Sequence, residues 1–203
     1  MESFRKMMEG VLEPVAPARP ESVDEKPTPA AVIVPIVVDE ERPLASEVLF
    51  TLRTQGVKSH KGQVSFPGGV IEPGDHDLLE TALRETQEET GIAPENFTLA
   101  GMLGIYNTLT GFKIQPFIGL LESRPKLELH RVEIDKAFYV PLGFLVDRSH
   151  VGEHDITWEG MTLRVGAYKW EDMIIWGATF NILVDFVERI HKIRGLKKIG
   201  SSE

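Results

Sequence analysis

A glycine-rich loop that leads into an acidic helix constrains this chain more than any other part of its sequence. Residues 68–91 read GGVIEPGDHDLLETALRETQEETG, with glycine and proline in the first half. In the second half apolar residues recur at the helical spacing, and Gly91 is a typical C-terminal stop. The pattern predicts a helix from about residue 76 to 90, with Asp75 or Asp77 as its N-cap.

Three glutamates lie close together near the C-terminal end of this helix. Glu85, Glu88 and Glu89 are three and four residues apart, so their carboxylates can converge at one surface spot. The helix dipole disfavours negative charge there, and Arg84 alone cannot neutralise three carboxylates. Because hard divalent cations take oxygen ligands, a bound cation would relieve the repulsion.

Two glycines, Gly68 and Gly69, end a predicted strand before the helix, and their backbone carbonyls can reach the same cation. A water bound to such a cation becomes a hydroxide-like nucleophile, and the cation offsets charge that develops on a phosphoryl group. The alternative interpretation is a solvated acidic helix face, which is what most acidic runs on helices are. The glycine-rich loop directly before the cluster favours the metal site.

Strand-like segments and one further helix surround this unit. Several strands of antiparallel type with two long helices indicate an α/β (α+β) sandwich, not a ladder of alternating parallel strands and helices. The first two predicted strands form a hairpin. We expect strands at 30–38, 46–53, 97–107, 112–121, 136–142 and 161–170, and a second long helix at 177–193.

Composition divides the chain of 203 residues into three parts. Residues 1–29 hold a short amphipathic helix and a proline-rich acidic stretch, which we interpret as a tether or a wrap-around arm. Residues 30–195 form one domain, for which the length provides enough apolar residues to fill a core. Residues 196–203 form a C-terminal tail.

The net charge of -9 and the absence of cysteine exclude several classes of function. An acidic chain has no broad basic face for a polynucleotide backbone, so we expect no nucleic acid partner. Without cysteine there is no thiolate nucleophile, disulfide or Cys-based zinc site. The N-terminus lacks a signal-peptide core and no apolar run can span a bilayer, so we expect a cytoplasmic protein with no membrane partner.

The segment RETQEETGI, Arg84 to Ile92, resembles the second half of the signature of the Nudix hydrolases, Arg-Glu-apolar-x-Glu-Glu-x-Gly-apolar. Thr86 occupies the position that is usually apolar. The first half departs from the family pattern, because Asp75 replaces the usual Glu and eight residues instead of seven precede Arg84. Family members that cleave coenzyme A carry a similar loop, so the departure favours that subfamily.

A second segment, residues 49–69, is similar to the one that coenzyme A pyrophosphatases of this family carry directly before the signature. It reads LFTLRTQGVKSHKGQVSFPGG, with Phe50, Thr54 and Lys58 as exchanges from the usual residues. The resemblance extends over about residues 30–192. It implies a Nudix-type α/β/α sandwich with a mixed central sheet, and Mg²⁺- or Mn²⁺-dependent cleavage of coenzyme A or its acyl derivatives to phosphopantetheine and adenosine 3',5'-bisphosphate.

The motif and the resemblance together suggest the metal ligands. We expect Glu85 and Glu89 to bind the metal directly, with the backbone carbonyl of Gly69. Glu88 would be a further metal ligand or would contact one of the ligands without binding the metal itself. Arg84 would orient one of these carboxylates.

The general base and the phosphate contacts are less closely defined by the sequence. Glu85 could also serve as the base, and Glu133 from a distant loop is the second candidate, with an exposed charge at a strand entry as its equal alternative. Arg53, Lys58 and His60 lie in a basic loop that could meet the substrate's phosphates. An ordinary solvated turn is the alternative for that loop.

Two other functions remain open. A Nudix hydrolase for another nucleoside diphosphate derivative, such as ADP-ribose or a damaged nucleotide, would share the glutamates without requiring the upstream segment. A non-catalytic nucleotide-binding module would tolerate loss of a metal carboxylate, whereas this chain keeps all three. In each case the partner is a small-molecule nucleotide. A homodimer is also left open, because Nudix proteins are often dimers and the N-terminal arm could exchange between subunits.

Overall fold

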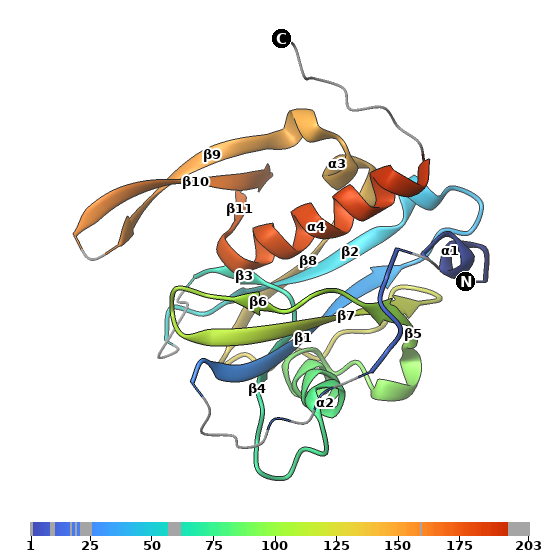
Figure 1. Ribbon diagram of the computed structural model, residues 1–203, viewed down its shortest axis with the longest axis horizontal. Coiled ribbons are helices and arrows are strands. Elements are labelled where there is room, and N and C mark those ends of the chain that lie inside the picture. The colour runs from blue at the N-terminus through green and yellow to red at the C-terminus, as the bar shows by residue number, and fades with distance from the viewer. Residues whose placement is uncertain are drawn as a thin grey trace.

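The computed structural model describes residues 2–8, 11–16, 18, 20, 26–56, 62–158 and 160–194. Within these residues an eight-stranded sheet lies between helices, and a separate three-stranded sheet packs beside the last helix (Figure 1). The helices are α1 (Glu2–Met8), α2 (Leu78–Thr90), α3 (Leu142–Val146) and α4 (Gly177–Arg194), with short 3-10 turns at Pro43–Ala45, Pro94–Asn96 and Arg148–His150. The strands are β1 (Thr28–Val37), β2 (Glu47–Arg53), β3 (Val64–Ser65), β4 (Gly68–Val70), β5 (Thr98–Met102), β6 (Tyr106–Asn107), β7 (Phe112–Leu121), β8 (Ile134–Pro141), β9 (Val151–Trp158), β10 (Met161–Trp170) and β11 (Met173–Trp176).

Strand β1 is the centre of the large sheet and makes that sheet mixed. It pairs in parallel with β7 over its whole length, from Thr28 to Val37. On its other side it pairs antiparallel with β4 at 30–32 and with β2 at 36–37. Pro35, which has no N–H to donate, lies where β1 exchanges β4 for β2 as its neighbour. The predicted hairpin of the first two strands is confirmed, and so is the mixed character of the sheet.

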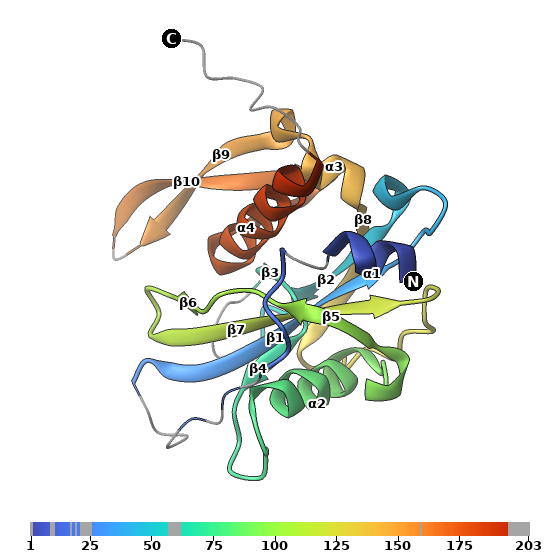
Figure 2. The same cartoon turned by 45° about the vertical axis from the view of Figure 1, so that its right-hand side comes forward.

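Alternate side chains of β1 build two cores on opposite faces of the sheet. Ala31 and Ile33 pack with Leu78 and Ala82 of α2. The other face carries the larger core beneath α4, and Figures 1 and 2 show α2 and α4 on opposite sides of the sheet. The predicted α/β/α sandwich is therefore confirmed. The larger core unites Val34, Ile36, Val48 and Phe50 of the sheet with Phe4 and Met8 of α1 and Leu183, Phe186 and Ile190 of α4.

The N-terminal segment wraps around the domain where the structure describes it. Phe4 and Met8 of α1 are fully buried in the larger core. Glu13 and Met102 exchange two backbone hydrogen bonds of 3.0 and 2.9 Å, so the arm covers the outer edge of β5. This contact supports the wrap-around interpretation over the tether.

The second sheet, β9–β10–β11, was only partly predicted. The sequence indicated β10, whereas β9 is largely exposed and carries the consecutive polar residues Glu153, His154 and Asp155, which do not predict a strand. The predicted strand at 97–107 is divided in the structure into β5 and β6. The helix predicted at 177–193 corresponds to α4. Among the described residues no helix has the length and apolarity needed to cross a membrane.

Candidate active site

Strand β4 brings two glycines against the acidic side of α2, where a side chain would not fit. A Cβ added to Gly69 would lie 2.4 Å from the carboxyl carbon of Glu85. A Cβ added to Gly68, whose φ is +148°, would lie 2.3 Å from the backbone oxygen of Ala31. The Gly68 N–H instead donates to Oε2 of Glu89 at 3.3 Å. Gly69 thus lets the Glu85 carboxylate approach β4, whereas Gly68 lets β4 lie close to β1.

The two ends of α2 are fixed by local capping. Asp77 is the N-cap, and its Oδ1 accepts hydrogen bonds from the N–H groups of Leu79 and Glu80 at 2.8 and 2.9 Å. Gly91 ends the helix in the left-handed conformation with φ of 77°. Of the two aspartates predicted as N-cap, Asp77 takes this position, which leaves Asp75 for another contact.

Asp75 is buried and anchors Arg84. Arg84 donates from Nε to Oδ1 at 2.9 Å and from Nη2 to Oδ2 at 3.0 Å. The hydroxyl of Thr81 and the N–H of Glu72 also donate to Oδ2 of Asp75. Burial alone would raise the pKa of Asp75, but the hydrogen bonds, led by that from Arg84, outweigh it and lower the pKa. The carboxylate therefore stays ionised.

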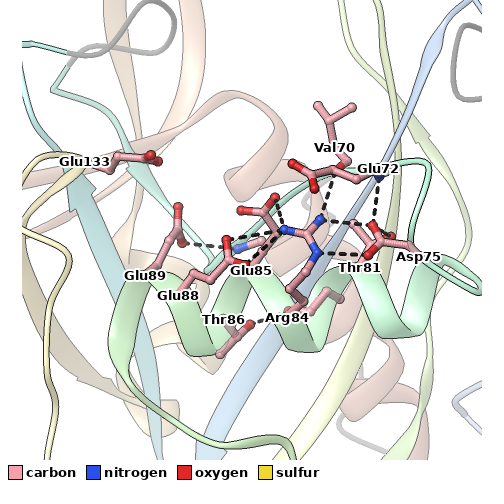
Figure 3. A network of polar contacts seen from close by, with 12 residues as sticks. Val70, Glu72, Asp75, Thr81, Arg84, Glu85, Thr86, Glu88, Glu89 and Glu133 are labelled. Atoms are coloured by element: carbon pink, nitrogen blue, oxygen red, sulfur yellow. Dashed lines mark hydrogen bonds and ion pairs between the residues drawn. The ribbon is translucent and has the colours of Figure 1, made fainter.

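The remaining nitrogen of Arg84 faces the glutamates. Figure 3 shows its guanidinium between Asp75 on one side and Glu85 and Glu88 on the other. Nη1 lies 3.0 Å from Oε1 of Glu85 and 3.3 Å from Oε2 of Glu88. Burial raises the pKa of Glu85, and Arg84 only partly opposes this. The Glu88 side chain is 58% exposed and points to solvent.

Glu89 lies deeper than the other two glutamates and binds a second arginine. Its Oε1 accepts from Nη1 of Arg53 at 2.9 Å. Nη2 of Arg53 lies 3.4 Å from Oε2 of Glu133, the residue before β8. Desolvation raises the pKa of Glu89 to about 7, although Arg53 and the Gly68 N–H favour its charged form.

The described residues contain no group of three or more His, Asp or Glu side chains arranged to hold a metal ion. Arg84 instead contacts Glu85 and Glu88, and Arg53 contacts Glu89, so each helix glutamate has an arginine partner. Glu85 and Glu89 share the side of α2 that faces the glycines, while Glu88 is turned to water.

The chemistry of Glu85, Glu89 and Gly69 nonetheless suits a hard divalent cation. All three offer oxygen atoms. Burial raises the pKa of both carboxyl groups despite the neighbouring arginines, so the arginines offset the cost of burying these negative charges only in part. Mg²⁺ in particular is commonly held by one or two carboxylates, with water and substrate phosphate in the remaining positions. Two carboxylates and a carbonyl fit that mode of binding.

The predicted phosphate contacts are only partly placed. Lys58 and His60 lie outside the described residues. Arg53 is described, and its guanidinium contacts Glu89 and Glu133. Sequence reasoning did not foresee these ion pairs, although alternation along β2 puts Arg53 on the same face as Leu49, which packs beside the end of α2. It also missed the function of Asp75 as the anchor of Arg84.

Comparisons with known proteins identify the family. The NUDIX domain family matches residues 27–153. An uncharacterized Nudix hydrolase NudL of Photorhabdus laumondii is 33% identical over 174 residues, covering 86% of this chain and 91% of the relative. NudL of Pectobacterium atrosepticum is 33% identical over 154 residues, covering 76% and 78%.

Solved structures show the same fold at low identity. A MutT/nudix family protein from Enterococcus faecalis has a TM-score of 0.54 at 16% identity, covering 88% of this chain and 70% of its own. The Nudix hydrolase RenU from M. smegmatis has a TM-score of 0.52 at 12% identity, covering 85% and 89%. The fold is the mixed α/β Nudix fold that the resemblance implied. Together with its matched domain and its relatives, this places the chain in the Nudix hydrolase family.

Proposed function

We propose that this chain is a metal-dependent pyrophosphohydrolase that cleaves coenzyme A, or an acyl derivative of it, to phosphopantetheine and adenosine 3',5'-bisphosphate. The observation that carries the proposal is the position of residues 49–69, whose sequence resembles that of coenzyme A pyrophosphatases. This segment forms most of β2, then β3 and the start of β4, and brings Arg53, Gly68 and Gly69 to the glutamates of α2. The similar segment therefore belongs to the same site as the Nudix motif.

The chain's residues would bind Mg²⁺ or Mn²⁺ through Glu85, Glu89 and the carbonyl of Gly69. Bound there, the ion would neutralise charge at the pyrophosphate and acidify a water molecule. Pyrophosphate cleavage requires charge neutralisation and an aligned water more than a covalent nucleophile, which suits a chain without cysteine. Arg84 orients Glu85 through Nη1 and is itself held by Asp75. Glu88 would support the cluster through Arg84 or bind a further ion.

Glu85 and Glu133 are the two candidates for the general base. The raised pKa of Glu85 moves it toward neutral pH, where a general base works best. Glu133 lies across from Glu89 in Figure 3, its side chain is 40% exposed, and Arg53 holds one of its oxygens. Glu133 can thus face both water and the site. A Glu133→Gln variant that loses most of its kcat would favour Glu133, because Glu133 is not among the proposed metal ligands.

A substrate panel tests the proposed substrate. Purified protein with Mg²⁺ or Mn²⁺ is offered coenzyme A, acetyl-coenzyme A, ADP-ribose and 8-oxo-dGTP, and the products are separated by mass. We expect a coenzyme A compound to give the highest kcat/KM. Much faster turnover of ADP-ribose or of 8-oxo-dGTP would replace coenzyme A with that substrate, and binding without turnover of any of the four would favour a non-catalytic module. The cytoplasmic location and the homodimer stay predictions from the sequence.

A further inference from the structure

We propose that Arg53 is a positioning residue that holds the buried Glu89 and joins it to Glu133, and that it does not bind the substrate's phosphates. The inference rests on the proposed function, because it concerns a residue of the same site. It differs from the sequence-based expectation, which placed Arg53 with Lys58 and His60 among phosphate contacts.

Strand β2 directs Arg53 toward α2. Leu49, Thr51 and Arg53 alternate onto the face of the sheet that α2 covers. At Arg53 the pairing of β2 with β8 shifts, because Leu52 lies opposite Lys136 whereas Arg53 lies opposite Ile134. The extra residue is Asp135, so the bulge bends β8, the strand that Glu133 directly precedes.

The guanidinium of Arg53 already has two carboxylate partners. Nη1 is 2.9 Å from Glu89 and Nη2 is 3.4 Å from Glu133. Nε is buried and has no hydrogen-bond partner in the described residues. The side chain is 20% exposed. These two contacts use one N–H of each terminal nitrogen and turn both nitrogens toward protein carboxylates, so the charge of Arg53 is already matched by two carboxylates inside the protein.

The planar fork of arginine suits this bridge, because its nitrogens can serve two acceptors at a fixed separation. Lysine has a single ammonium group and cannot reproduce that geometry. The bridge joins three elements that are distant in sequence, since Arg53 ends β2, Glu89 lies on α2 and Glu133 precedes β8.

The backbone next to Arg53 reinforces the same connection. The Thr54 N–H donates to the carbonyl of Glu133 at 2.8 Å, and the Thr54 hydroxyl donates to the carbonyl of Val132 at 2.9 Å. Residues 132 and 133 are thus held by the backbone at the end of β2 while Arg53 holds the Glu133 side chain. The separation of Glu89 from Glu133 is therefore set at the end of β2.

Mn²⁺ binding without substrate is the first test, measured by electron paramagnetic resonance for Arg53→Gln, Arg53→Lys, Glu89→Gln and the double variant Arg53→Gln/Glu89→Gln. We expect Arg53→Gln to weaken Mn²⁺ binding about tenfold, as removal of a residue that supports a ligand commonly does, and Arg53→Lys to fall between it and the wild type. The double variant should bind Mn²⁺ about as weakly as Glu89→Gln alone. Arg164→Gln, on the exposed β9–β10 hairpin, is the control and should match the wild type.

Steady-state kinetics is the second test and separates positioning from substrate binding. For Arg53→Gln we expect a lower kcat with KM for coenzyme A within about twofold of the wild-type value, and the same pattern with the analogue that lacks the 3'-phosphate. Unchanged Mn²⁺ affinity together with a raised KM for coenzyme A would overturn the proposal and restore Arg53 as a phosphate contact. So would additive losses in the double variant.

The outcomes also distinguish this proposal from the proposed function. If the wild type binds Mn²⁺ but does not hydrolyse coenzyme A, the proposed substrate is wrong. The Mn²⁺ titration of the variants then still tests whether Arg53 positions Glu89. If the wild type binds no Mn²⁺, both the metal site and the positioning function of Arg53 are overturned.

Discussion

Asp75 and Arg84 are joined by two hydrogen bonds, from Nε to Oδ1 at 2.9 Å and from Nη2 to Oδ2 at 3.0 Å. The pair spans the loop between β4 and α2, and the Asp75 side chain is only 4% exposed. Because two nitrogens of Arg84 are fixed in this way, its third nitrogen points to Glu85. The loop thereby controls the direction of a proposed metal ligand.

Replacing Asp75 with Asn should therefore affect both stability and activity. The amide keeps the shape but removes the negative charge that faces Arg84, so we expect the free energy of unfolding to fall by about 2 kcal/mol. We expect kcat to fall about tenfold, since Arg84 loses its orientation. Urea unfolding and steady-state kinetics measure the two effects. Asp77→Asn is the matched control, because Asn caps a helix as well as Asp, and equal losses in the two variants would contradict this function of Asp75.

The close approach of Gly69 to Glu85 predicts a selective loss of activity. In Gly69→Ala the new methyl group would lie against the Glu85 carboxylate and must displace it, and small displacements of catalytic groups can reduce rates about a hundredfold. Gly74→Ala is the control, because a Cβ at Gly74 meets nothing within 4 Å. Activity assays on both variants check this. Near wild-type activity in Gly69→Ala would show that catalysis does not depend on the position of the Glu85 carboxylate beside Gly69.

The buried Glu89 predicts how stability depends on pH in the metal-free protein. Its pKa is raised by desolvation from 4.5 to about 7, so between these values the native state binds more protons than the unfolded state. The free energy of unfolding should therefore fall as pH rises through this range, by at most about 3 kcal/mol. Glu89→Gln has no ionisable group at this position and so lacks this pH-dependent contribution to the free energy of unfolding. Urea unfolding in the presence of a chelator, at pH 5 and at pH 8, measures the free energy of unfolding of both proteins. We expect the stability of Glu89→Gln relative to the wild type to be higher at pH 8 than at pH 5. The same stability difference at both pH values would contradict the burial of an ionisable Glu89.

Asp185 of α4 predicts a pH effect of the opposite sign. Burial would raise its pKa, but hydrogen bonds from Arg189 and Tyr106 outweigh burial and lower the pKa. Its stabilising contribution is thus present above its unfolded pKa of 3.8 and is lost as pH falls through the lower native value. The side chain is 34% exposed, so we expect Asp185→Asn to cost only about 1 kcal/mol at pH 7.

Unfolding of wild type and Asp185→Asn at pH 7 and near pH 3 measures this contribution. The difference between them should shrink at the lower pH, and a cost that is the same at both values would show that the charge of Asp185 is not its source. Asp155→Asn, in the exposed pair with Arg164, is the control and should be nearly neutral at pH 7.

Much of the fold follows from local signals in the sequence. Asp77 and Gly91 define α2 to within a residue or two, a nearly unbroken apolar run identifies β1, and apolar residues interrupted by Lys113 and Gln115 identify β7. The parallel pairing of β1 with β7 could not be derived in the same way, because it depends on contacts between residues more than eighty positions apart. Strand β9 was missed because its exposed, charged residues resemble those of a loop.

In the site too, features that depend on neighbouring residues could be predicted from the sequence, whereas contacts between distant residues could not. The helical spacing of Glu85 and Glu89 is sufficient to identify the acidic cluster from the sequence. The ion pair of Arg53 with Glu89 joins residues 36 positions apart, and only the pairing of β2 with its neighbours brings them together. Asp75 was visible as a departure from the family pattern, but its function required the orientation of Arg84.

The products formed from coenzyme A by the wild type and by Glu85→Gln, in Mg²⁺ and in chelator, test the central claim most directly. Mass spectrometry should detect phosphopantetheine and adenosine 3',5'-bisphosphate from the wild type in Mg²⁺ alone, and at most traces from the variant. Full metal-dependent activity in Glu85→Gln would contradict the site, and a wild type that leaves coenzyme A intact would contradict the proposed substrate.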